Sequence, residues 1–263
     1  MDEPALDRSD FVSRRQLLQV AGGLGVAALV GACASKPLLD SAPTRGWGQP
    51  SANLAATDSI STSPAPNAAS AELLCRDAWG AQPARPGGKP HSITRMTLHH
   101  EAVVLGENRN APGRLRQDQH YHQDQKGWID IAYHVGVDRN GNIYELRSPK
   151  IAGDTATDYD TTGHLLVLCE GDFDQEAVSE AQLHGAALAF AWAAQNFGIA
   201  TTTLAGHRDL AQTSCPGRNL YAHLTSGDLK HRVDDLLAAG EVGLPLLCGP
   251  SAAARVAAIE AGS

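Results

Sequence analysis

Aromatic residues and positive charge are both scarce in this 263-residue sequence. Aromatics make up only 5% of the chain, so the core must depend on alanine, leucine, valine and isoleucine. The formal net charge is -8 at pH 7, which excludes a chain-wide basic field that would attract phosphates. We therefore expect no nucleic-acid partner.

An apolar run long enough to cross a bilayer is missing from the N-terminal region. The apolar stretch at 20–30 is shorter than the roughly 20 residues that a membrane helix requires. It follows Arg14 and Arg15 and is followed by small residues and Cys33, an order typical of a signal peptide. The arginine pair resembles a twin-arginine export signal, and the segment before Cys33 resembles a lipoprotein processing site.

We therefore expect residues 1–32 to be a twin-arginine lipoprotein signal peptide. Cys33 would carry the lipid that anchors the exported protein to a membrane of the cell envelope. A buried N-terminal helix with a chance arginine pair is the alternative. Residues 33–70 are rich in Ala, Ser, Pro and Thr without apolar periodicity, and we expect a disordered tether there.

Folded structure is expected in one domain at 71–240, followed by a C-terminal tail at 241–263. Apolar and β-branched patterns predict strands, and helical spacing with capping residues predicts helices. Their alternation indicates an α/β domain with a central mixed β-sheet flanked by helices. The predicted strands are 93–99, 131–137, 143–146 and 164–169; the predicted helices are 114–125, 180–197 and 226–239.

The cysteine count is odd, so the five cysteines cannot all pair into disulfides. A bridge between Cys75 and Cys248 is one option that the sequence leaves open. Cys215 is a candidate for metal chemistry instead. The sequence also leaves the oligomeric state open.

Three separate segments carry the residue types of a catalytic metal site. The first ends at His99, the second includes Tyr133, and the third holds His207 and Cys215. Zinc binds imidazole nitrogen and thiolate sulfur, and a catalytic site uses three protein ligands plus an open position. Taken singly, His99 could equally be a core histidine, and Cys215 a buried free thiol.

Together, these segments resemble the peptidoglycan recognition protein (PGRP) and phage T7 lysozyme family of zinc N-acetylmuramoyl-L-alanine amidases, which share the amidase type 2 domain. The similar pieces run in the family's order across about residues 75–235. They are 76–81 (RDAWGA), 98–100 (LHH), 127–134 (GWIDIAYH), 138–145 (DRNGNIYE), 206–209 (GHRD) and 213–217 (TSCPG).

The resemblance implies a PGRP-like fold, a Zn²⁺ cofactor and hydrolysis of the amide bond between N-acetylmuramic acid and L-alanine in peptidoglycan. His99, His207 and Cys215 match the family's zinc ligands, and Tyr133 matches its catalytic tyrosine. Thr213 lies where members carry Thr or Lys beside the metal. The implied partners are muramyl peptides of peptidoglycan.

Physical chemistry is consistent with these implied roles. Zinc lowers the pKa of bound water and polarises a carbonyl. Tyr133 would stay protonated and could donate a hydrogen bond to the developing oxyanion, and Thr213 offers a second hydroxyl. The identity of the general base stays open. His100 and Glu101 are candidates, but consecutive strand residues face opposite ways, so at most one of them should point where His99 points. Glu101 stands where members place a small hydroxyl residue, and we expect it on the outer rim.

Other functions remain alternatives. A non-catalytic peptidoglycan-binding protein is the first, although binding members of the family lose the cysteine ligand and Cys215 is present. An amidase for another acylated peptide is the second, because segment 151–163 departs from the family's groove-forming stretch. A structural zinc site would require a fourth protein ligand. We expect His122, His134 and His164 to be structural residues or substrate-wall residues.

Overall fold

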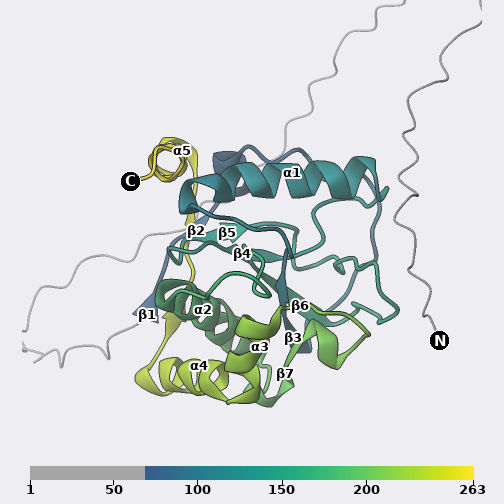
Figure 1. Ribbon diagram of the computed structural model, residues 1–263, viewed down its shortest axis with the longest axis vertical. Coiled ribbons are helices and arrows are strands. Elements are labelled where there is room, and N and C mark those ends of the chain that lie inside the picture. Colours follow the sequence, from purple (N-terminus) through teal and green to yellow (C-terminus); the bar gives the residue numbers. More distant parts are fainter. Residues whose placement is uncertain (1–68) are drawn as a thin grey trace, which may run out of the picture. The chain divides into compact units, whose positions relative to one another are not determined.

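A seven-stranded mixed β-sheet organises residues 69–263, the part of the chain that the computed structural model describes (Figure 1). The strand order is β7-β3-β6-β4-β5-β2-β9, and every pair is parallel except β4 with β5. The strands are β2 (Leu73–Leu74), β3 (Arg95–His100), β4 (Val135–Val137), β5 (Ile143–Glu145), β6 (His164–Cys169), β7 (Leu204–Gly206) and β9 (Leu246–Leu247). The predicted signal peptide, Cys33 and nearly all of the predicted tether lie outside the described residues.

Helices cover both faces of this sheet. Figure 1 shows α1 and α5 on one side and α2, α3 and α4 on the other. Each group of helices packs over its own cluster of buried apolar residues. The α-helices are α1 (Ala111–Asp124), α2 (Glu180–Phe197), α3 (Arg218–Thr225), α4 (Asp228–Ala239) and α5 (Gly249–Glu260), with short 3-10 helices at η1 (Arg76–Trp79), η2 (Asn108–Asn110), η3 (Thr201–Thr203) and η4 (His207–Asp209). The predicted α/β class with a central mixed sheet is confirmed.

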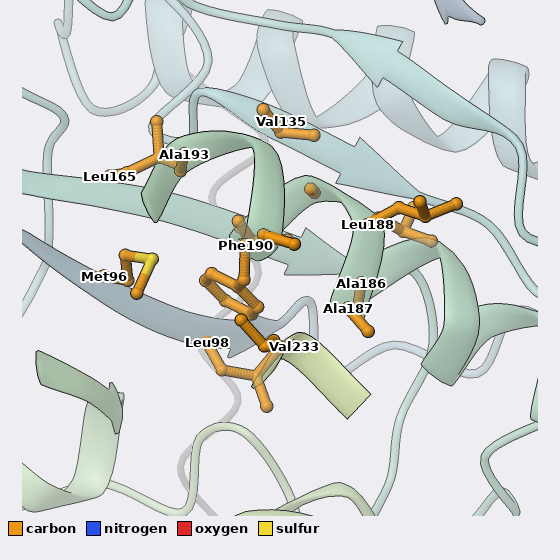
Figure 2. Packing of buried hydrophobic residues seen from close by; sticks show 14 of the residues in the cluster. Met96, Leu98, Val135, Leu165, Ala186, Ala187, Leu188, Phe190, Ala193 and Val233 are labelled. Carbon is orange, nitrogen blue, oxygen red and sulfur yellow. The ribbon is translucent and has the colours of Figure 1, made fainter. Parts of the chain in front are cut away.

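Alanine-rich α2 packs closely against the sheet and forms the larger core (Figure 2). Its one buried aromatic ring, Phe190, lies among Met96 and Leu98 of β3 and Val233 of α4. A Cβ added at Gly185 would lie 2.8 Å from Val137 of β4. Small residues on α2 therefore set the close approach of this helix to the sheet.

The predicted ends of α2 agree with the structure. The Ser179 side chain accepts a hydrogen bond from the Gln182 backbone N–H, and Gly198 ends the helix with φ 65°. The side-chain amide of Gln182 donates to the carbonyls of Val137 and Glu170. These bonds tie the start of α2 to the carboxyl ends of β4 and β6.

Two elements differ from the sequence-based expectation. The strand predicted at 131–137 is shortened to β4, because the buried guanidinium of Arg147 takes the carbonyls of Asp130 and Ile131. The helix predicted at 226–239 is preceded by a separate α3, and Gly227, with φ 79°, lies between α3 and α4.

Residues 241–263 are folded, although we expected only a tail there. They form β8 (Val242–Gly243), which pairs with β1 (Ala69–Ser70), then β9 and α5. A disulfide joins Cys75 to Cys248 just before α5, and α5 buries Val256 in the cluster around Trp79. The C-terminal segment is therefore part of the folded domain. No helix among residues 69–263 is long and apolar enough to cross a membrane.

Candidate active site

Three predicted ligand residues meet at one edge of the sheet. His99 lies near the end of β3, His207 begins η4 directly after β7, and Cys215 lies in the loop before α3. Because β3 and β7 are parallel neighbours, their carboxyl ends meet at the same edge. One ligand atom from each of the three residues lies within 4.8 Å of the others.

The donor set fits a zinc ion. Cys215 Sγ lies 3.7 Å from His99 Nδ1. Bond lengths of about 2.3 Å to sulfur and 2.0 Å to nitrogen at a tetrahedral zinc place such ligand atoms about 3.6 Å apart. Nε2 of His207 is hydrogen-bonded to Thr157, which leaves its Nδ1 for a metal. The three side chains could therefore hold a metal ion.

Burial favours neutral imidazoles at this site. It lowers the pKa of His99 well below its usual value and that of His207 to about 4. Neutral imidazole is the form that binds metals. Burial also raises the pKa of the Cys215 thiol to about 12. A cation would stabilise the thiolate there, because coordination to a metal deprotonates a thiol.

Tyr133 and Thr213 lie beside the trio, and all five residues line one cavity of about 300 Å³. The ring centroids of Tyr133 and His99 are 5.2 Å apart. Burial, with the nearby Cys215 thiol and carboxylates, raises the pKa of Tyr133 well above its usual value, so its phenol is a hydrogen-bond donor at neutral pH. Thr213 Oγ1 accepts the Cys215 backbone N–H at 3.2 Å, and its own proton is left to donate.

The three histidines that we expected to be structural or wall residues divide between the cavity wall and the scaffold. His122 lines the cavity. His134 is a scaffold residue, since its Nδ1 accepts the Leu166 N–H at 2.9 Å and its Nε2 lies 3.0 Å from the Ile151 carbonyl. His164 is also internal, with Nδ1 2.7 Å from Thr97 Oγ1.

Glu101 does not lie on the outer rim, and that prediction is wrong. Its side chain is only 5% exposed and lies 3.3 Å from Arg114 Nε. Glu101 follows directly after β3, and its side chain lies on the α1 side, beside Arg114 of α1. There it meets two acids that the sequence analysis missed, Asp118 and Glu170. One carboxylate oxygen from each of the three acids lies within 4.8 Å of the others. Burial raises the pKa of all three carboxyls, which favours shared protons within the cluster.

His100 faces away from His99, as strand alternation predicts. Its ring stacks on Phe173 at 6.2 Å, and its Nδ1 accepts the Phe173 N–H at 3.3 Å. The sequence analysis also missed Thr157 and Tyr159, which form hydrogen bonds to His207 and His99. No local pattern in segment 151–163 marks these contacts, because they join residues 50 and 60 positions apart.

Known proteins resemble the chain in both sequence and fold. Residues 89–218 match the family described as N-acetylmuramoyl-L-alanine amidase. Peptidoglycan-recognition protein LB of Drosophila melanogaster is 30% identical over 166 residues, which are 60% of this chain and 69% of that protein. The chain belongs to the family of peptidoglycan recognition proteins (PGRPs) and N-acetylmuramoyl-L-alanine amidases.

The relatives of this protein are named either as recognition proteins or as amidases. An N-acetylmuramoyl-L-alanine amidase of Sus scrofa is 31% identical over 154 residues, which are 56% of this chain but only 25% of that enzyme. A crystal structure of peptidoglycan recognition protein LE in complex with tracheal cytotoxin, a monomeric diaminopimelic acid-type peptidoglycan, aligns with a TM-score of 0.55 and 26% identity. It covers 62% of this chain and 98% of that one. The family therefore includes proteins named for recognition and proteins named for catalysis.

Proposed function

We propose that this protein is a zinc-dependent N-acetylmuramoyl-L-alanine amidase that cleaves the amide bond between N-acetylmuramic acid and L-alanine in peptidoglycan. The supporting observation is the convergence of His99, His207 and Cys215 within 4.8 Å in a cavity that Tyr133 also lines. These three residues would hold Zn²⁺. Three protein ligands leave the open position that a catalytic zinc site requires.

The chain's own residues would assist the reaction at two points, the scissile carbonyl oxygen and the loop that carries Cys215. Bound zinc supplies Lewis-acid activation of water and of the scissile carbonyl. The Tyr133 phenol donates a hydrogen bond to the carbonyl oxygen as negative charge develops on it. Thr213 holds the Cys215 loop through the Cys215 N–H, and its hydroxyl keeps a proton to donate.

We infer that the substrate is a muramyl peptide of peptidoglycan. The inference is supported by family membership and by the ligand in the related LE structure, a monomeric peptidoglycan fragment. The wall built from His122, Trp128 and Lys126 offers apolar, aromatic and cationic groups to such a ligand. Segment 151–163 forms part of the same wall, through Asp154, Thr155 and Thr157.

Release of L-alanine amino termini from purified peptidoglycan tests this proposal. Protein loaded with one equivalent of zinc should release them, and release should stop when a chelator removes the metal. A protein that retains zinc and binds peptidoglycan without releasing amino termini would be a recognition protein instead. Peptidoglycan recognition without cleavage is the second candidate function, because some relatives are named recognition proteins and others amidases.

We also propose that the protein is exported and held on a membrane of the cell envelope through lipid on Cys33. The Cys75–Cys248 disulfide supports export, because such bonds persist mainly in oxidising compartments. Replacing Cys33 with Ala should move the protein from the membrane fraction to the soluble fraction of the envelope. Retention of the Cys33→Ala variant on the membrane would refute the anchor.

A further inference from the structure

Three hydroxyl groups of segment 151–163 lie within hydrogen-bond distance of the Nε2 atoms of the metal-site histidines; the most distant, Thr155 Oγ1, is 3.5 Å from His207 Nε2. Thr157 Oγ1 lies 2.7 Å from His207 Nε2, and Tyr159 Oη lies 3.3 Å from His99 Nε2. We propose that Thr157 and Tyr159 are positioning residues that orient both imidazoles for metal binding through Nδ1. This inference rests on the proposed zinc site.

Hydrogen-bond direction follows from the imidazole tautomer. A neutral histidine that binds metal through Nδ1 carries its proton on Nε2. His207 Nε2–H therefore donates to Thr157 Oγ1, and the Thr157 hydroxyl donates onward to Thr155 Oγ1, 2.8 Å away. Thr155 Oγ1 also accepts the Thr157 backbone N–H at 3.1 Å. The chain of donors runs in one direction, away from the metal side of the ring.

Tyr159 plays the matching part for His99. Its phenol oxygen lies 3.3 Å from His99 Nε2 and can accept the Nε2–H of that ring. The Tyr159 ring also lies edge-on to His207, with centroids 5.0 Å apart. One side chain thus restricts the rotation of both imidazoles.

The segment is held rigidly enough to fix these hydroxyls. Asp154 pairs with the buried guanidinium of Arg147 at 2.5 Å. Farther along, Thr161 Oγ1 donates to the Gly153 carbonyl at 2.7 Å. A Cβ at Gly153 would lie 2.4 Å from the Ala132 carbonyl oxygen, so the chain passes close to the scaffold there. The segment is therefore held on both sides of Thr157 and Tyr159.

Zinc affinity measured by competition with a chromophoric chelator tests the proposal. Hydrogen-bond partners of metal ligands typically contribute 10–100-fold to affinity, so we expect Thr157→Val and Tyr159→Phe each to weaken zinc binding by about 10-fold or more. Thr157→Ser keeps the hydroxyl and should restore wild-type affinity. Thr162→Val is the matched control, because the Thr162 hydroxyl donates to exposed Asp160 and not to an imidazole.

Cobalt substitution supplies a second readout that a merely structural role would not change. The visible d–d bands of the Co²⁺ protein should shift in Thr157→Val and Tyr159→Phe but not in Thr162→Val. If Thr157→Val fails to fold, Tyr159→Phe and Thr157→Ser still give the comparison. Unchanged zinc affinity and unchanged cobalt bands in both variants would overturn the positioning role alone. A wild-type protein that binds no zinc would overturn the proposed function, and this inference with it.

Discussion

Tyr133 lies beside His99, with ring centroids 5.2 Å apart, and lines the same cavity as Thr213. Its phenol has a single proton to donate. Replacing Tyr133 with Phe removes that proton and keeps the ring. We expect kcat to fall by about 100-fold, as when one oxyanion donor is lost, while zinc content stays at one per chain. Steady-state kinetics and metal analysis would check this. Unchanged kcat would remove Tyr133 from the mechanism.

Cys215 should be required for both metal and activity. In Cys215→Ser a hydroxyl replaces the thiol, and a hydroxyl is a poor ligand for zinc compared with thiolate. We expect zinc and amidase activity to be lost together. Cys169→Ala is the control, because Cys169 is the other free cysteine among residues 69–263 and lies buried in the sheet. Full activity in Cys215→Ser would exclude a metal role for this sulfur.

His134 makes stability depend on pH. Burial lowers its pKa from 6.5 to about 3, so below pH 6.5 the unfolded chain gains a proton that the folded state does not, and stability is lost as pH falls towards 3. His134→Asn should therefore lose about 2 kcal/mol less unfolding free energy between pH 7 and pH 5 than wild type. Urea unfolding at both pH values would measure this. Equal losses in the two proteins would contradict it.

At the residue level, the sequence marked residues that converge where a motif names them, and it gave no signal where only packing decides; the zinc-ligand role itself stays a prediction. His99, His207 and Cys215 are recognisable because each lies in a short segment with family-specific neighbours, and the structure brings them together. Glu101 has no such signal. It lies just past the end of β3, and its burial depends on Arg114 and Asp118, which reach it from α1.

At the level of elements, α2 has the clearest signals and the simplest test. Ser179→Ala removes the oxygen that accepts the Gln182 N–H and should lower the free energy of unfolding by about 1 kcal/mol. Ser179→Thr keeps an oxygen at that position and should recover most of the loss. Chemical denaturation of the three proteins at one pH would decide. A stable Ser179→Ala variant would mean that the cap contributes nothing measurable.

Elements with local signals were predictable, and elements fixed by distant side chains were not. Helix α2 has a cap at each end, and the hairpin between β4 and β5 has its Asn140-Gly141 turn, with Gly141 at φ 81°. The shortening of β4 depends on the guanidinium of Arg147, 16 and 17 positions away from the carbonyls that it binds. Contacts of that kind leave no periodicity in the strand itself.

At the scale of the whole molecule, the C-terminal segment was the largest departure from expectation. Its short strands gain stability only by pairing with β1 and β2. Helix α5 packs against η1, which lies near the start of the domain in sequence. Short apolar pieces of this kind are hard to distinguish from a tail before their partners are known. The Cys75–Cys248 bond joins these two ends of the fold.

This bond should contribute to the stability of the folded domain. The double variant Cys75→Ala/Cys248→Ala should lose about 2–5 kcal/mol of unfolding free energy, the usual cost of removing a native disulfide. Wild type treated with reductant should behave like the variant, and the variant should not respond to reductant. Thermal and urea unfolding in both conditions would check this. A double variant as stable as oxidised wild type would contradict the prediction.

Because Cys75 and Cys248 are separated by 173 positions, His99, His207 and Cys215 all lie inside one covalent ring. A protease that cleaves a single surface loop of this ring would open it without freeing either piece. On a non-reducing gel the nicked protein would still migrate as one species. If Cys33 carries lipid as proposed, both halves of the damaged domain would also stay attached to the membrane.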